Sequence, residues 1–351
     1  MSVVDHKCPA CLAELKFKPQ LQKWVCDYCG SEYTLEDIKS KDGAEESKTI
    51  KKSASITYKG YNCPDCGAEI VMEENTSVTE CVYCGNTAII SERLEGDFAP
   101  KQIIPFKKEK NDAVNAFINY KKGKWFMPKE FLQKSNIQKI SGVYIPFYLY
   151  DIKVAARINV EATKTKTWSD RNYRYKETEN YNVLREGNMD FNLIPTDASK
   201  KFPDDIMDSI EPYDYKGLVD FDASYMSGFL SEKYDLTMDE MAERAENRAK
   251  KSAVQELLNN VSGYSSKRVV NSTEKAKIKE SSKYVLLPVW MLNVKYDNKM
   301  YTLAMNGQTG KFIGNVPISK NQVIKYWLII FAASAAVMMI LNLLGLFNFL
   351  G

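Results

Sequence analysis

The stretch CPACLAELKFKPQLQKWVCDYCG occupies residues 8–30 and contains two Cys-x-x-Cys pairs separated by fourteen residues. Four thiolates at this spacing are typical of a tetrahedral structural Zn²⁺ site, to which each pair contributes two sulfurs. A module of this size has too small a core to fold alone, so the metal would supply much of its folding free energy. The pattern therefore predicts a zinc ribbon over residues 1–38, with the ligands Cys8, Cys11, Cys26 and Cys29.

The same spacing recurs 55 residues further along the chain. It predicts a second zinc ribbon over residues 61–96, joined to the first by a flexible, polar linker at 39–60. Three of the four pairs are followed by glycine, which suits the tight turn of a metal knuckle, whereas Leu12 stands at that place in the first pair. The predicted ligands of the second structural zinc ion are Cys63, Cys66, Cys81 and Cys84.

All eight cysteines lie in these pairs, and the N-terminus lacks the apolar core of a secretory signal. Thiols with this spacing in a reducing compartment bind metal more often than they form disulfides. The cysteine-bearing part of the chain is therefore expected in the cytosol.

The other end of the chain is apolar. Residues 326–351, YWLIIFAASAAVMMILNLLGLFNFLG, include no charged side chain. About 20 residues rising ~1.5 Å each cross a hydrocarbon core of ~30 Å, so one transmembrane helix is predicted over 326–346. Tyr326 and Trp327 stand where aromatic side chains mark a membrane interface.

The charges beside this span set its orientation. Lys320 and Lys325 precede it and nothing charged follows, so the positive-inside rule leaves the preceding chain in the cytoplasm. The sequence predicts a single-pass protein of the plasma membrane, with the lipid bilayer as one partner. Ala332 and Ala336 form a small-xxx-small pair compatible with self-association.

Residues 97–320 are expected to form a cytosolic α+β body, of mixed α/β content, with an internal β repeat. VYIPFYLYDIKV (143–154) and VLLPVWMLNVKY (285–296) align at an offset of 142, and both are rich in strand-forming residues. Asn306-Gly307 between two alternating runs indicates a hairpin.

Two helices are predicted within the body. The pair Thr237 and Glu240 has the capping-box spacing and opens a helix that runs to about Asn260. A shorter helix is expected over residues 108–120, ending before Gly123.

The distribution of charge helps to distinguish a zinc ribbon that binds nucleic acid from one that binds protein. Residues 1–38 carry a net charge of −2, residues 61–95 one of −6, and residues 96–351 one of +8. Four thiolates around Zn²⁺ add about −2 to each ribbon, which opposes binding to a phosphate backbone. A membrane-tethered nucleic-acid binder remains the alternative to a protein-binding adaptor, and the basic body is expected near the anionic leaflet.

The chain offers little for catalysis. Its one histidine, His6, reads as a surface residue, and phosphate-loop, HExxH and GxSxG patterns are missing from the sequence. Asp204, Asp205 and Asp208 are interpreted as a solvated helix start rather than as catalytic carboxylates. We expect a protein that is not an enzyme, with no catalytic residues.

Several longer segments carry a family resemblance. They include IIPFKKEKNDAVNAF, KWFMPKEF, GVYIPFYLYD, IEPYDYKGLVDFDASYMSGFLSEKYDL and LPVWMLNVKYDNKMYTLAMNGQTGKFIG, beside the CPxC and CxYCG ribbons and the terminal span. With these segments the chain resembles the YdjG-like family, bacterial membrane proteins with transcription-factor-IIB-type zinc ribbons. The resemblance implies a scaffold in a phage-shock-like envelope-stress complex, which recruits soluble and membrane partners (PspA-like) to the membrane.

Overall fold

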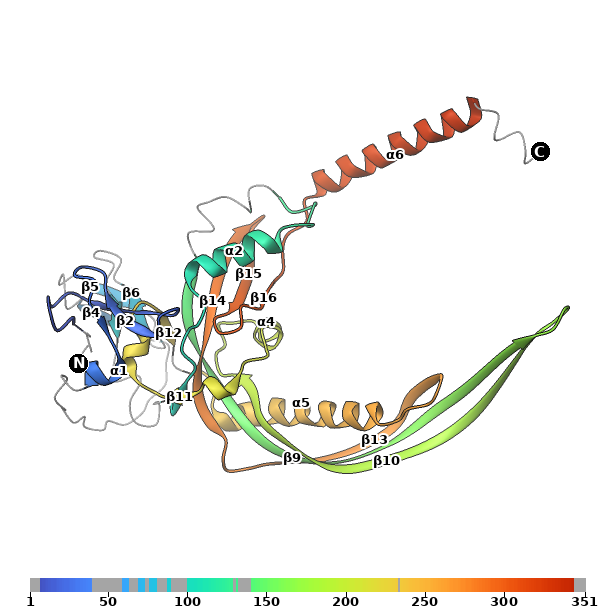
Figure 1. Ribbon diagram of the computed structural model, residues 1–351, viewed down its shortest axis with the longest axis horizontal. Coiled ribbons are helices and arrows are strands. Elements are labelled where there is room, and N and C mark those ends of the chain that lie inside the picture. The colour runs from blue at the N-terminus through green and yellow to red at the C-terminus, as the bar shows by residue number, and fades with distance from the viewer. Residues whose placement is uncertain are drawn as a thin grey trace.

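The computed structural model describes residues 7–39, 59–62, 69–72, 76–80, 87–89, 100–128, 131, 140–232 and 234–343. The chain has mixed α/β content, with a large sheet at its centre (Figure 1). The N-terminal module lies on one side of this body, and the apolar helix α6 (Lys320–Leu343) leaves it on the other. A long curved arm of strands extends away from both.

The N-terminal module is a small sheet. Strands β1 (Leu15–Lys18), β2 (Lys23–Cys26) and β3 (Glu32–Tyr33) pair antiparallel in that order, and the short helix α1 (Leu35–Lys39) follows. Next come β4 (Lys59–Asn62) and β5 (Glu69–Met72), which form a hairpin of their own. Strands β6 (Thr76–Glu80) and β7 (Thr87–Ile89) then pair with each other, and β6 joins the edge of the central sheet.

Two long strands form the centre of the body. Strand β9 (Ser141–Ser169) pairs antiparallel with β14 (Lys283–Tyr296), so the two segments of the predicted β repeat lie side by side. Ile145 lies opposite Leu287, its own equivalent in the repeat, because the offset between them is again 142 residues. The two segments are therefore related by a local two-fold axis that passes between Ile145 and Leu287.

Each half of the repeat begins with a short strand that pairs with the long strand of the other half. Strand β8 (Gln102–Ile103) runs parallel to β14, and β12 (Leu230–Glu232) runs parallel to β9. A helix with a capping box follows each short strand: α2 (Lys110–Tyr120) and α5 (Met238–Asn259). The two helices begin 128 residues apart, which is also the separation of Gln102 from Leu230.

Side-chain hydrogen bonds follow the same symmetry. The indole Nε1 of Trp290 donates to the carbonyl of Lys108 at 2.8 Å, and the hydroxyl of Tyr148 donates to the carbonyl of Leu236 at 2.9 Å. Both donors occupy the same place in their long strands, and both acceptors lie just ahead of a capping-box helix. Each bond ties the start of a helix in one half of the repeat to the long strand of the other half.

The return strands complete each half. Strand β9 turns back into β10 (Arg174–Asp197), and β14 turns back into β15 (Lys299–Asn306), which ends in a turn to β16 (Phe312–Gly314). The predicted hairpin at Asn306-Gly307 is this last turn, where Gly310 N donates to the Asn306 carbonyl at 2.9 Å. The edge strand β11 (Val219–Asp220) pairs with β8.

The arm is built by β9, β10 and β13 (Ser266–Ile278), with α5 along one face (Figure 1). The helix presents a row of small residues at four-residue spacing to the strands, which permits a close approach. This row consists of Ala245, Ala249 and Ala253 and ends at Leu257. The strand residues Val154, Ala156, Ile158, Val160 and Ala162 are buried on the inner face of β9.

An ionic cluster joins α5 to the end of β10 and to the segment that follows it. Arg244 donates to the buried Asp197 at 2.8 Å and to Asp208 at 2.7 Å, and Arg248 donates to Glu211 at 2.6 Å. Burial raises the pKa of Asp197 to about 6, although Arg244 opposes this shift. The helix α4 (Asp204–Ser209) is therefore more than a solvated helix start, since Asp204 and Asp208 hold the guanidinium of Arg244.

Helix α6 begins six residues before the predicted span, at Lys320, and its described part ends at Leu343. Tyr326 near its start packs beside Phe126, but its most apolar stretch within the described residues is not buried against the body. A helix of 24 residues is about 36 Å long at 1.5 Å per residue. It is long and apolar enough to cross a membrane.

The paired hydrogen bonds of the repeat provide a stability test. Replacing Tyr148 by Phe removes the bond to Leu236 and should lower the free energy of unfolding by about 1 kcal/mol, while Trp290→Phe should cost more because the smaller ring also leaves a cavity. Chemical denaturation of the detergent-solubilised chain measures both. Tyr173→Phe is the matched control, since Tyr173 is 67% exposed. A Tyr148→Phe variant as stable as this control would contradict the assigned role.

Candidate metal centre

The first two cysteine pairs form two matching turns. Leu12 N donates to the Cys8 carbonyl at 2.8 Å, and Gly30 N donates to the Cys26 carbonyl at 2.9 Å. Gly30 has a φ of +75° and Leu12 one of +63°, so both turns need the left-handed conformation. Glycine adopts it without cost, whereas for leucine it costs roughly 1–2 kcal/mol. The predicted departure at Leu12 is thus accommodated by strain, and the turn keeps its shape.

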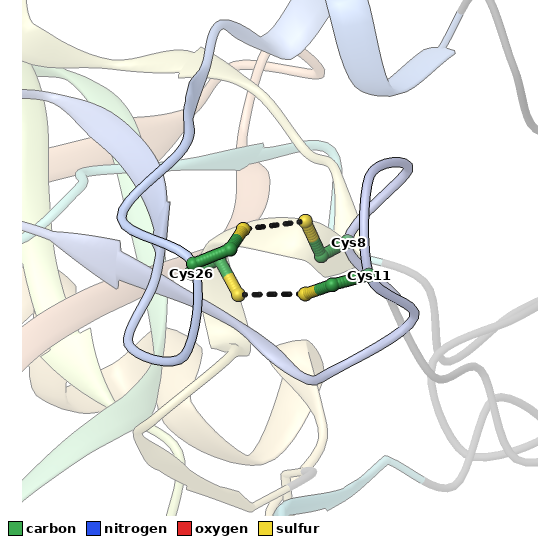
Figure 2. Close-up of side chains that lie close together, drawn as sticks. Cys8, Cys11 and Cys26 are labelled. Carbon is green, nitrogen blue, oxygen red and sulfur yellow. Dashed lines mark hydrogen bonds between the residues drawn. The ribbon is translucent and has the colours of Figure 1, made fainter.

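These turns bring four sulfur atoms together. The Sγ atoms of Cys8, Cys11, Cys26 and Cys29 all lie within 4.8 Å of one another. Cys8 Sγ is 3.6 Å from Cys29 Sγ, and Cys11 Sγ is 3.5 Å from Cys26 Sγ. Figure 2 shows the labelled side chains Cys8, Cys11 and Cys26 converging on one small space.

The spacing of the sulfurs fits a metal ion. A tetrahedral site with Zn–S bonds of about 2.3 Å places its sulfurs about 3.8 Å apart, close to the distances observed. A disulfide would need about 2.05 Å, and the four cysteines are free thiols. The predicted first set of ligands is therefore assembled as a cluster that can bind one metal ion.

The electrostatics of the cluster call for a cation. Burial raises the pKa of Cys8, but hydrogen bonds from the Tyr33 hydroxyl and nearby backbone groups lower it to about 6. At Cys11 a backbone hydrogen bond at Ala13 lowers the pKa, while burial and the three neighbouring thiols raise it to about 12. Without a cation the four thiols therefore do not all ionise near neutral pH. A bound metal ion would stabilise all four thiolates together.

The module is docked firmly on the body. Trp24 is 1% exposed, its Nε1 donates to the Ser224 carbonyl at 2.8 Å, and its ring packs 5.0 Å from that of Tyr225. Phe17 packs against both of these rings. Lys39 adds an ion pair with Asp222 at 3.0 Å. The metal turns are thus held in a fixed position relative to the body.

The second predicted set of ligands lies outside the described residues. Cys63, Cys66, Cys81 and Cys84 belong to it, and His6 lies outside the described residues as well. The strands β4 to β7, between and beside these cysteines, are described, so the polypeptide on either side of each pair is extended.

The fold and the site define a chain with an N-terminal four-cysteine cluster, a two-fold repeated β-rich body and a C-terminal apolar helix. The chain belongs to the YdjG family. It is 32% identical, over 321 residues, to a Bacillus subtilis (strain 168) protein named "Uncharacterized protein YdjG", and the alignment covers 92% of both chains. No family model and no solved structure matches the chain. The predicted membership of the YdjG-like family is confirmed.

Loss of one buried ligand should release the metal and undock the module. In the Cys26→Ser variant we expect one fewer bound metal ion per chain by mass spectrometry of the purified protein, because the site loses a quarter of its donors. Trp24 should then become accessible to an aqueous quencher. Tyr28→Ser is the control, since Tyr28 lies between two ligands but is 84% exposed. Unchanged metal content in Cys26→Ser would contradict the assigned ligand set.

Proposed function

We propose that this protein is a membrane-anchored adaptor that holds a soluble protein partner at the cytoplasmic face of the plasma membrane. The observation that carries the proposal is the placement of its parts. A metal-cluster module is fixed on one side of the body, and an exposed apolar helix leaves the other side (Figure 1). This arrangement suits the display of a rigid surface at a distance from a bilayer.

The anchor in this proposal is α6, crossing the membrane once with the N-terminus in the cytosol. Its large apolar side chains are exposed, for example Ile330 at 67% and Met339 at 68%. Exposing an apolar surface of this extent to water is unfavourable. A bilayer would cover it, and a bundle of several α6 helices is compatible with the same exposure.

The display surface in this proposal includes the two metal turns. Leu12 is 73% exposed and Tyr28 84% exposed, and each lies in a different turn. Leu12 has a left-handed backbone conformation, which glycine would adopt without strain. Strain retained at an exposed position is typical of functional sites, since stability alone would favour glycine. An aromatic and an aliphatic side chain beside a rigid cluster suit an apolar pocket on a protein partner.

The charges on the module favour a protein partner over a nucleic acid. Lysines suited to phosphate contacts are engaged by neighbouring carboxylates: Lys16 and Lys18 by Asp27 at 3.4 Å and 3.1 Å, and Lys23 by Glu32 at 3.0 Å. Lys39 is paired with Asp222 in the docking contact. A polyanion would have to break these pairs and approach a cluster of thiolates.

We further propose that both cysteine sets bind structural Zn²⁺, as tandem zinc ribbons, and that the partner is a phage-shock-type protein of the envelope-stress response. The first part is supported by the fit of the four described sulfurs and by the repeat of the same spacing at residues 63–84. The second part is supported by the family resemblance of the sequence. In this proposal the protein performs no chemistry of its own.

Removal of the anchor should convert the protein to a soluble form. A chain ending at Lys325 lacks most of the exposed apolar helix, so we expect it in the supernatant after ultracentrifugation of a cell lysate. The full chain should remain in the pellet after alkaline carbonate washing. Metal content should be the same in both forms, which controls for folding of the module. A full chain that carbonate extracts from the membrane would refute the anchor.

A double variant should separate partner binding from folding. Leu12→Gly removes the strained backbone and should stabilise the module by roughly 1 kcal/mol, while Tyr28→Ser removes the exposed ring. Together they should abolish capture of the phage-shock-type partner from detergent extracts, as measured by quantitative mass spectrometry, with metal content unchanged. Leu21→Ser is the matched control, because Leu21 is 52% exposed on the same module but lies in the turn between β1 and β2.

Two outcomes would count against the adaptor. One is equal capture of the partner by the wild type and the double variant, which would move the binding surface away from the metal turns. The other is micromolar binding of DNA or RNA by the solubilised full chain at about 0.15 M salt, weakening steeply with added salt, which would favour the nucleic-acid alternative.

A further inference from the structure

A short loop beside the base of α6 combines basic and aromatic side chains. Residues 121–126, KKGKWF, connect α2 to the segment that follows it. The loop contains three lysines and no acidic residue, and it ends in two large exposed rings: Trp125 is 65% exposed and Phe126 41%.

The loop is tied to the start of α6, although about 200 residues separate them in the chain. Ser319 N, just before the helix, donates to the Phe126 carbonyl at 2.7 Å. The Tyr326 ring lies 5.5 Å from that of Phe126 and 6.0 Å from that of Trp125. Figure 1 shows the chain after α2 reaching the first turn of α6.

The side chains at this junction match the interface of a bilayer. Aromatic rings lie on both segments, with Trp327 exposed at 62% next to Tyr326. Cations lie on both segments as well: Lys320 and Lys325 on α6, and the three lysines of the loop. Lys124 also covers the Tyr120 ring, with its Nζ 4.0 Å from the ring centroid. Trp and Tyr favour the headgroup layer of a membrane, and lysine is attracted to its anionic lipids.

We propose that residues 121–126 lie in the headgroup layer of the anionic cytoplasmic leaflet and form, with the first turns of α6, a membrane-contacting belt drawn from two distant parts of the chain. The loop would then fix the orientation of the body on the membrane, since a single helix alone permits rotation about its own axis. This inference rests on the membrane anchor of the proposed function. Lipid is the partner of this belt because the exposed rings and cations are continuous with the base of the apolar helix.

The test uses the full chain in vesicles that contain roughly one third phosphatidylglycerol. The remaining lipid is phosphatidylcholine with bromine on the part of the acyl chain nearest the headgroup. Bromine quenches tryptophan emission at short range. Trp125→Phe should remove about half of the quenchable emission, because Trp125 and Trp327 would share the interface. Trp168→Phe is the matched control: Trp168 is 46% exposed on the arm, and its loss should remove only unquenched emission.

A charge variant tests the role of the lysines. In one variant Lys121, Lys122 and Lys124 are all changed to Glu. Quenching of its Trp125 in anionic vesicles should fall to the value that the wild type shows in vesicles of phosphatidylcholine alone. The corresponding changes at Lys164, Lys166 and Lys176 of the arm should leave it unchanged. About 1 M salt should reduce the quenching in the wild type.

The outcomes separate the loop from the anchor. If carbonate extracts the chain from the vesicles, the anchor fails and this inference fails with it. If the chain stays in the vesicles but Trp125→Phe and Trp168→Phe remove equal amounts of bromine-quenchable emission, the inference alone is overturned. Shielding of Trp125 from aqueous iodide that grows with protein density, without bromine quenching, would assign the loop to a contact between two copies and would also overturn it.

Discussion

The antiparallel pairing of β9 with β14 is the constraint on which the rest of the body depends. Because Ile145 faces its own equivalent Leu287, several elements attached to one strand have a counterpart attached to the other, whereas β13 pairs with β9 alone. The short strands β8 and β12, the capped helices α2 and α5, and the return strands β15 and β10 all follow from this one register. A shift of either strand by one residue would turn all of its side chains toward the opposite faces of the sheet.

Local signals in the sequence predicted a good part of this structure. The capping pair Thr237 and Glu240 marks the start of α5, and the Cys-x-x-Cys spacing marks the first metal cluster. Both signals act within a few residues or through a single metal ion, so they can be recognised without knowing the fold. The apolar run after Tyr326 is local in the same sense, and α6 occupies it.

Contacts between residues far apart in the sequence were not predicted. The Trp24 indole meets the Ser224 carbonyl across 200 residues, and nothing beside either residue indicates the other. A strand was predicted only over residues 143–154, whereas β9 continues to Ser169 and returns in β10. Residues 163–167 of this extension alternate Thr with Lys and have no apolar face that would indicate a buried strand. Asp208 was assigned to solvent for a similar reason, since its partner Arg244 lies on a helix that follows later in the chain.

The two halves of the body exchange their short strands. Strand β8 pairs with β14, and β12 pairs with β9, so each half supplies the strand that extends the sheet beside the long strand of the other half. A single half would be left with an open edge, which a second identical molecule could close in the same way. The body thus has the form of a symmetric homodimer fused into one polypeptide. The two halves differ most in the hairpin, since β9 and β10 extend into the arm over 29 and 24 residues, whereas β14 and β15 have 14 and 8.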